Sequence, residues 1–131
     1  MNYNLGGKKI DLSQLGNYIT GFFQKNDFFV SISSIHDGYK IIAKPKTYSN
    51  IKEKITVKIK GQPNSFSVTF DAKSFLGKFT ILGNLLTLFF GGYLLLRELK
   101  SRENLEKFER EFWIYVNNVV EKLIGDSAPL S

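Results

Sequence analysis

A chain of 131 residues suits a single folding unit with a core of its own, and we expect one domain over residues 1–131. It contains no cysteine, which excludes a disulfide framework and a thiolate metal site, and the single histidine excludes a zinc cluster built on imidazoles. The net charge of +6 is uneven: residues 1–102 hold fifteen Lys or Arg against six Asp or Glu, and residues 103–131 hold three against six. We therefore expect an anionic partner to meet the first part of the chain.

The first helix is predicted over residues 12–25. Asp11 followed by Gln14 has the spacing of a capping box, which marks the start of a helix. The apolar residues then recur at intervals of three and four and would share one helix face: Leu12, Leu15, Ile19, Phe22 and Phe23. Gly16 and Gly21 each cost a helix roughly 1 kcal/mol relative to alanine, so we expect this helix to depend on packing against another element.

A first hairpin is predicted next, because the apolar pattern changes to strict alternation. Phe28, Val30 and Ile32 alternate with Phe29, Ser31 and Ser33. The Asp37-Gly38 pair then supplies the positive-φ positions that a tight turn requires. Residues 39–44 return as the second strand, which ends before Pro45 because proline cannot donate to a strand ladder.

The clearest alternation predicts a third and a fourth strand around a turn at residues 61–64. The apolar residues of these two strands would share one face: Ile55, Val57, Ile59, Phe66, Val68 and Phe70. The polar residues would share the other: Lys54, Thr56, Lys58, Lys60, Ser65, Ser67, Thr69 and Asp71. This pattern indicates an antiparallel sheet with one dry face and one wet face, and the predicted helices are available to cover the dry face.

Residues 79–96 (FTILGNLLTLFFGGYLLL) form a run of eighteen residues without a charge, near the lower limit for crossing a bilayer core of roughly 30 Å. Asn84 and the Gly91-Gly92 pair would weaken a membrane span, and basic residues lie on both sides of the run, so the positive-inside rule gives no orientation. We expect the two glycines to divide the run into two pieces, at roughly residues 74–90 and 93–100, with the second piece running into the final helix. An apolar helical segment at residues 75–96 would then fold back over the sheet, line an apolar cavity, pair with a second copy or lie on a membrane surface.

Seven side chains of this segment are the candidates for apolar contact: Phe79, Leu82, Leu85, Leu86, Phe89, Phe90 and Tyr93. A final helix is predicted over residues 101–124, capped by Ser101 and ended by Gly125. Its apolar residues lie on one stripe: Leu105, Phe108, Phe112, Val116, Val119 and Leu123. Its glutamates alternate with cations at helical spacing, which is typical of a solvated outer face.

The lysines of the wet face are the best candidates for contact with an anionic partner, and four are predicted to carry it: Lys52, Lys54, Lys58 and Lys60. Lys40 and Lys44 would extend the same face. The alternative is an ordinary solvated sheet, on which lysines prevent aggregation. A site for single-stranded nucleic acid would also need exposed aromatic residues between the lysines, and Phe29 and Tyr39 are the candidates.

No catalytic residue, metal site or cofactor is predicted. His36 lies beside Asp37 in a turn, where a solvated histidine is the usual case, since acid–base or metal chemistry needs convergent partners. Gly77-Lys78 has the end of a phosphate-loop motif, but Phe79 occupies the position of its Ser or Thr and Ala72 that of its first glycine. The first 26 residues lack the pattern of a secretory signal, so we expect a cytoplasmic protein, with membrane association as an option.

Together these patterns predict an α+β protein with two layers. A four-stranded antiparallel sheet of two hairpins would be covered by an N-terminal helix, the apolar helical segment and a long C-terminal helix. The expected function is a non-enzymatic binding module that uses the apolar segment for contact with an apolar ligand, an anionic membrane surface or a second subunit, assisted by the basic sheet face. Two alternatives stay open: a nucleic-acid-associated protein acting through the lysine face, and a single-span membrane protein with a cytoplasmic N-terminal domain.

Overall fold

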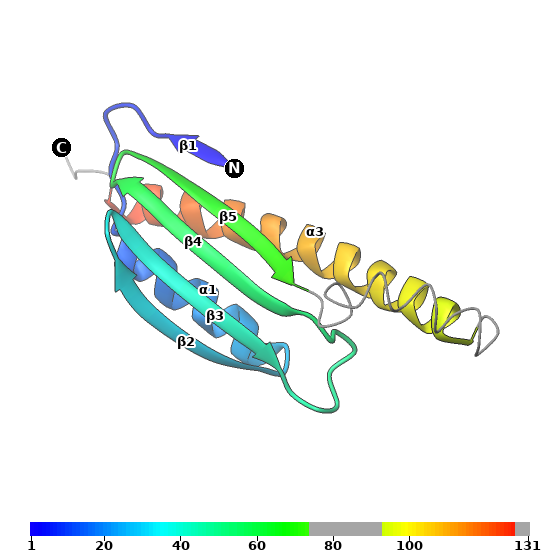
Figure 1. The fold of residues 1–131 in the computed structure, drawn as a ribbon. Helices are drawn as coiled ribbons and strands as arrows, with labels where there is room; N and C mark the ends of the chain where they lie inside the picture. The colour runs from blue at the N-terminus through cyan, green and yellow to red at the C-terminus, as the bar shows by residue number, and fades with distance from the viewer. Residues whose placement is uncertain (74–92, 128–131) are drawn as a thin grey trace.

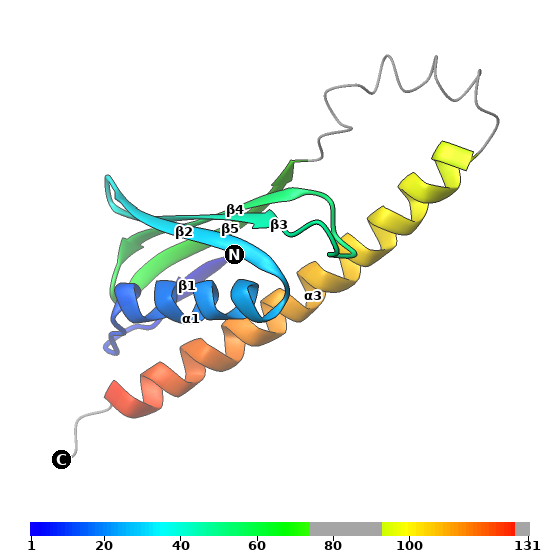
Figure 2. The same cartoon turned by 90° about the horizontal axis from the view of Figure 1, so that it is seen from below.

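The computed structural model describes the backbone of residues 1–73 and 93–127, and the side chains of residues 1–72 and 103–125. It confirms the α+β class and the antiparallel sheet. The sheet has five strands in the order β1-β5-β4-β3-β2, one more than predicted. Helices α1 and α3 lie on the same face of this sheet, and no described element covers the opposite face (Figures 1 and 2).

The strand that the sequence did not predict is β1, Asn2–Asn4. It pairs antiparallel with the start of β5, with Tyr3 opposite Phe66, and the two rings stack with their centroids 5.1 Å apart. The amino group of Met1 donates to the carbonyl oxygen of Val68 at 2.7 Å, which fixes the chain end against β5. Three residues are too few to show an alternation, so the sequence pattern carried no signal for this strand.

Helix α1, Leu12–Lys25, has the predicted bounds. The carboxylate of Asp11 accepts hydrogen bonds from the amide and the hydroxyl of Ser13, at 2.9 and 2.7 Å, and so satisfies one of the amides that a helix start leaves unpaired. The predicted apolar stripe faces the core, where Leu15, Ile19 and Phe23 are completely buried. Helix α1 packs on the sheet, and this contact supplies the stabilisation that a helix containing Gly16 and Gly21 needs.

Strands β2, Phe28–Ile35, and β3, Gly38–Pro45, form the first hairpin with His36 and Asp37 as the turn. Only Asp37 of the predicted Asp37-Gly38 pair has a positive φ, 68°. Gly38 has a different reason to be glycine: it is the first residue of β3, and a Cβ there would lie 1.7 Å from the carbonyl oxygen of Ile59. The close approach of two backbones, and not the turn conformation, requires this glycine.

Strands β4, Lys54–Gln62, and β5, Ser65–Lys73, form the second hairpin, and their predicted alternation is confirmed. Ile55, Val57, Ile59 and Val68 are completely buried between the sheet and the helices. Because side chains of a strand alternate between faces, the lysines between these residues must lie on the other side of the sheet. The dry and wet faces are therefore as the sequence predicted.

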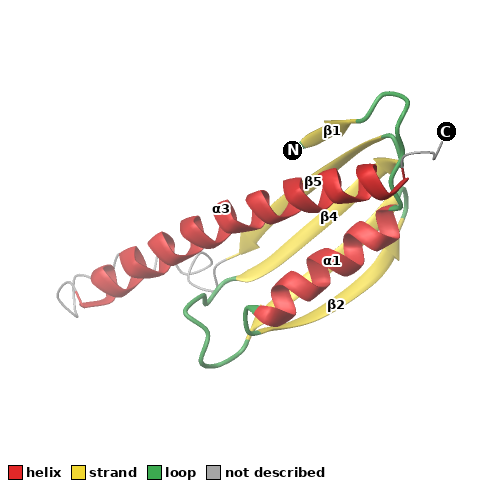
Figure 3. Cartoon of the chain, turned by 180° about the vertical axis from the view of Figure 1, so that it is seen from behind, coloured by secondary structure: helices red, strands yellow, loops and turns green. Residues whose placement is uncertain are grey.

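Helix α3, Tyr93–Ser127, is longer than the predicted helix over residues 101–124, and it includes the piece at residues 93–100 that was predicted to run into that helix. Ser101 lies inside it and not at its start, and Gly125 does not end it, since one glycine in the last turns costs less than the packing supplies. The helix crosses the dry face beside α1, and its first turns extend past the end of the sheet (Figures 2 and 3). The predicted stripe is buried: Phe112 and Val116 completely, Phe108 and Leu123 at 5% exposure.

Aromatic rings join the layers at the centre of the core. Phe112 of α3 packs on Phe70 of β5 at 5.0 Å and on Phe23 of α1 at 5.8 Å, measured between ring centroids. Phe22 of α1 packs on Tyr115 of α3 at 4.9 Å. These contacts place the terminal helix against the sheet, as its apolar stripe requires.

The apolar segment predicted at residues 75–96 lies outside the described residues up to Gly92, and from Tyr93 onward its backbone forms the start of α3. Within residues 1–73 and 93–127, neither helix combines the length and apolar character needed to cross a bilayer.

Candidate functional site

The open face of the sheet carries the predicted lysines on its two central strands. Lys54, Lys58 and Lys60 lie on β4, and Lys40 and Lys44 lie on β3. Lys44, Lys54 and Lys60 are exposed, while Lys40 and Lys58 are half-buried, as long side chains are when their stems lie along a sheet. We call these five residues the lysine face.

The strand register brings like charges together on this face. Lys40 lies directly opposite Lys58, so two cations are neighbours across the strands. Such a pair is destabilising in a sheet, yet none of the five lysines forms an ion pair with another described residue. The described strands offer one acid on this side, Asp71, which lies opposite Thr56. Among the described residues, no ion pair therefore neutralises the positive charge of the lysine face.

Lys52, the fourth predicted residue, is placed differently from the other three. It lies in the connection between β3 and β4, and its ammonium group donates to the carbonyl oxygen of Thr47 at 3.3 Å. The structure therefore brings Lys54, Lys58 and Lys60 together on one strand and puts Lys52 at the end of the sheet, on the loop. Residue alternation could not show this, because Lys52 precedes the strand.

Two exposed aromatic side chains lie at the same end of the molecule. Phe29, 66% exposed, is paired with Lys44 in the sheet, and the ammonium group of Lys46 lies 5.2 Å from the centre of its ring. Tyr48 in the β3–β4 connection is 69% exposed. Lys46 was not among the predicted residues, although it lies two residues after Lys44 in the returning strand, an offset that could have placed it near Phe29.

Tyr39, the second candidate for base stacking, is not on the lysine face. It lies opposite Ile59 in the sheet and packs against the core cluster on the dry side. Phe29 is therefore the one aromatic side chain that the described strands present among the lysines. A platform for single-stranded nucleic acid, which needs successive stacking residues, is not formed by these strands.

On the opposite side of the sheet, the second part of α3 has the reverse charge. From residue 103 onward α3 carries six acids and three bases, and the side chains of Glu103, Glu106, Glu111 and Glu121 are exposed. The molecule therefore has a cationic sheet face and a helix that is acidic over its second part. Such an asymmetry would orient the protein in the field of an anionic surface.

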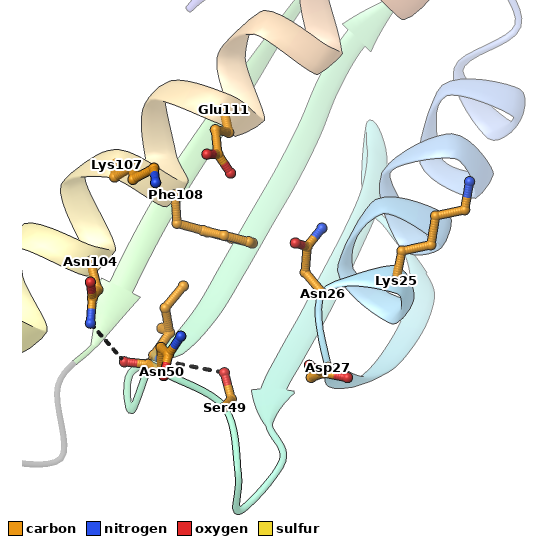
Figure 4. Close-up of a pocket in the computed structure, with 10 residues that line it drawn as sticks. Lys25, Asn26, Asp27, Ser49, Asn50, Asn104, Lys107, Phe108 and Glu111 are labelled. Carbon is orange, nitrogen blue, oxygen red and sulfur yellow. Dashed lines mark hydrogen bonds between the residues drawn. The ribbon is translucent and has the colours of Figure 1, made fainter.

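A cleft of about 250 Å³ lies between the end of α1, the β3–β4 connection and α3 (Figure 4). Its wall from α3 includes Phe108, Lys107 and Glu111, and Lys25 and Asp27 lie opposite. Several of its polar groups serve the fold and are engaged with backbone. The side-chain amide of Asn104 donates to the carbonyl oxygen of Asn50 at 3.5 Å, and the side-chain amide of Asn26 donates to the carbonyl oxygen of Phe22 at 2.7 Å. The hydroxyl of Ser49 accepts from the backbone amide of Ile51 at 3.2 Å.

This cleft is best explained as the joint that fixes the β3–β4 connection to both helices. Lys25 and Lys107 nevertheless give it cations of its own, which makes it a useful comparison for the lysine face. His36 lies in the β2–β3 turn, with its side chain 97% exposed and its Nε2 3.5 Å from the carboxylate of Asp37.

Of the seven residues predicted for apolar contact, six lie outside the described residues: Phe79, Leu82, Leu85, Leu86, Phe89 and Phe90. The seventh, Tyr93, is the first residue of α3. Their flanks are placed, however. β5 ends at Lys73 at the end of the sheet where β4 begins with Lys54, so the apolar run follows the cationic end of the sheet in the chain.

No family model, no curated protein and no solved structure matches this chain. The geometry of the described residues is therefore the ground for a functional proposal.

Proposed function

We propose that this protein is a non-enzymatic binding module whose lysine face attaches it to an anionic membrane surface. The observation that supports this most is the uncompensated charge of the open sheet: five lysines on two adjacent strands, with Lys40 directly opposite Lys58 and no ion pair to a described residue. A cross-strand repulsion of this kind is relieved when phosphate or carboxylate headgroups lie between the ammonium groups.

The arrangement of the other side chains favours a membrane over nucleic acid. A membrane is a broad anionic plane, and an open sheet with long lysines can meet it with several charges at once. Phe29 and Tyr48 lie at one end of the face, and aromatic rings are suited to the boundary between headgroups and acyl chains. Base stacking, in contrast, would need aromatics between the lysines, where the described strands have threonine and isoleucine.

We further propose, from the sequence alone, that the uncharged run over residues 79–96 adds apolar contact to this attachment, with lipid or with a second subunit. The anionic leaflet of a cell membrane faces the cytoplasm, so a cytoplasmic protein held at the membrane is the localisation that fits both parts of the proposal. A charged face and an apolar segment would act together, since one signal alone gives weak and reversible membrane attachment.

The test compares two variants of equal charge in vesicle co-sedimentation. One carries Lys54→Gln, Lys58→Gln and Lys60→Gln on the lysine face, and the control carries Lys8→Gln, Lys25→Gln and Lys107→Gln, which are exposed elsewhere. Each juxtaposed lysine contributes about 1 kcal/mol to binding of an anionic membrane, so the first variant should bind vesicles containing phosphatidylserine on the order of 100-fold more weakly than the control. Added salt should weaken binding of the wild type.

Two further arms separate the alternatives. Vesicles of phosphatidylcholine alone measure the contribution of the apolar run, because lysines have no anionic partner there. A mobility-shift assay with single-stranded and duplex DNA at low salt measures nucleic-acid binding. Equal loss of vesicle binding in both triple variants, or binding of DNA without binding of anionic vesicles, would contradict the proposed function.

A further inference from the structure

Strand β2, Phe28–Ile35, is a free edge of the sheet. It is last in the strand order, its one neighbour is β3, and no described element lies beyond it (Figures 1 and 3). All eight residues are paired with β3, so a full row of backbone donors and acceptors points outward on the other side. An edge of this length is a template for pairing with another strand.

The side chains of β2 lack the features that usually prevent such pairing. The strand has the sequence FFVSISSI, with no lysine or other charge and no proline. Four consecutive residues, Ser31 to Ser34, are exposed, and Ile32 is 38% exposed although it points to the dry side. Proteins normally protect an edge with charges, prolines, bulges or a very short strand.

The opposite edge of the same sheet shows such protection. There the last strand is β1, with only three residues, and it covers β5 from Ser65 to Ser67. Beyond it, β5 carries the charged residues Asp71 and Lys73. The two edges of one sheet are therefore treated differently, and only β2 is both long and uncharged.

The neighbouring side of α1 is also without charge. Residues 12–24 and 28–35 contain no Asp, Glu, Lys or Arg, although 23% of the whole chain is charged. A Cβ at Gly16 of α1 would lie 2.8 Å from Cδ1 of Ile32, so this part of the helix is next to β2. Helical spacing puts Asn17 and Thr20 near this flank, away from Tyr18 and Phe22, which contact α3. Depletion of charged residues marks the centre of protein interfaces.

We propose that β2 pairs antiparallel with β2 of a second copy of this chain, about a two-fold axis that makes one continuous sheet of the two molecules. The self-pairing is favoured because an isologous interface places the same strand against itself, and a strand without charge has nothing to repel its own copy. A partner with a charged strand would find no complementary charge on β2 or on the adjacent side of α1.

The register of this pairing has two solutions. Residues directly opposite each other in an antiparallel pair point to the same face, so the axis must set one residue against its own copy. Ser31 and Ile32 are the two residues at the middle of the strand and give the longest pairing. Centring on Ser31 sets Val30 against Ile32 of the second copy on the dry side, and centring on Ile32 sets the two Ile32 side chains against each other. Both registers cover the side chain of Ile32, which is partly exposed in the single chain.

This inference does not depend on membrane binding, since it concerns backbone pairing. One consequence does rest on the proposed function: an axis perpendicular to the sheet puts the lysine faces of both copies on the same side. The two lysine faces would then bind one membrane surface together, and the affinity of the dimer would exceed that of a single chain, as for any bivalent ligand.

The first experiment is light scattering of the purified chain after size exclusion. The wild type should have twice the 15.0 kDa mass of one chain. A variant with Ser31→Lys and Ser33→Lys sets cation against cation in either register, because residue 31 lies opposite its own copy in the first and opposite residue 33 in the second. This variant should be a monomer with unchanged circular dichroism. Thr69→Lys adds charge to an exposed site on the opposite half of the sheet and should leave the dimer intact.

The second experiment uses the absence of cysteine from the chain. Ser31→Cys or Ile32→Cys should form a disulfide with its own copy under mild oxidation, because residues on the axis have Cα atoms at a separation that a disulfide can bridge. Thr69→Cys, equally exposed, reports random collisions. A monomeric wild type, a dimer that survives the two lysines, or cross-linking of both edge positions no faster than that of Thr69→Cys would overturn the inference.

Discussion

Gly38 and Gly21 have opposite effects on stability, because the space around the position of a Cβ differs between them. At Gly38 a methyl group would lie 1.7 Å from the carbonyl oxygen and 2.8 Å from the carbonyl carbon of Ile59, both in the backbone of the neighbouring strand. At Gly21, in the interior of α1, no heavy atom lies within 4 Å of the added carbon. The first glycine permits strand pairing, whereas the second only weakens its helix.

We therefore expect Gly38→Ala and Gly21→Ala to change stability in opposite directions. Gly38→Ala should lower the free energy of unfolding by about 3 kcal/mol or more, because backbone atoms cannot rotate away from the clash. Gly21→Ala should raise it by up to about 1 kcal/mol through helix propensity. Urea denaturation followed by circular dichroism measures both. Equal changes in the free energy of unfolding for the two variants would contradict the close approach of the Gly38 and Ile59 backbones.

The start of α1 depends on a single carboxylate, and this dependence should be visible in pH. Hydrogen bonds from the hydroxyl of Ser13 and then from its amide hold the pKa of Asp11 below its ordinary value. A carboxyl whose pKa is lowered by folding adds stability above its unfolded pKa of about 3.9, and this stability is lost as the pH falls through the folded pKa.

Asp11→Ala should accordingly lower the free energy of unfolding by about 1 kcal/mol at pH 7, which is the usual cost of losing a helix cap. The difference from the wild type should shrink as the pH falls below about 4. Asp11→Asn keeps a side-chain oxygen that can accept from Ser13, so its stability relative to the alanine variant should not change with pH in this range. If the difference in the free energy of unfolding between the wild type and Asp11→Ala stayed constant down to pH 2, the role of the Asp11 charge would be contradicted.

The elements show where sequence patterns are sufficient and where they are not. Both ends of α1 could be predicted from Asp11 and from the apolar stripe between Leu12 and Phe23, because a helix cap and an apolar spacing depend only on nearby residues. The alternation around Ile55 to Ile59 gave the faces of β4, and with them the place of Lys54, Lys58 and Lys60. β1 escaped notice because three residues cannot show a period, and its pairing with β5 joins positions far apart in the chain.

The start of the last helix illustrates a different cause. Ser101 looked like a cap because a hydroxyl residue preceded a charged amphipathic stretch, but a serine is also tolerated inside a helix. Between Tyr93 and Ile124 there is no proline and no glycine, so nothing in the chain interrupts the backbone ladder at residue 101. Likewise Tyr39 was a candidate for the wet face until the register fixed it opposite Ile59, because one residue of slip at a hairpin changes the face of every side chain.

At the scale of the whole molecule, charge and neutrality are distributed over different surfaces. The open sheet is cationic, α3 carries six acids against three bases from residue 103 onward, and the side formed by β2 and α1 has no charge through residues 12–24 and 28–35. We propose one partner for each of two surfaces: an anionic plane for the lysine face and a second copy for the edge. Neither role requires a bound small molecule, and the cleft beside Phe108 supplies Lys25 and Lys107 for the control variant.

The orientation of the protein on vesicles tests the central proposal most directly. A nitroxide label would be attached through Thr69→Cys, exposed beside the lysines, or through Asn118→Cys, exposed on α3, in a chain with no other cysteine. On binding to vesicles that contain phosphatidylserine, the label at residue 69 should lose its accessibility to a water-borne paramagnetic nickel complex, while the label at residue 118 should keep it. Shielding of residue 118, or full accessibility of residue 69 in vesicle-bound protein, would contradict attachment through the open face of the sheet.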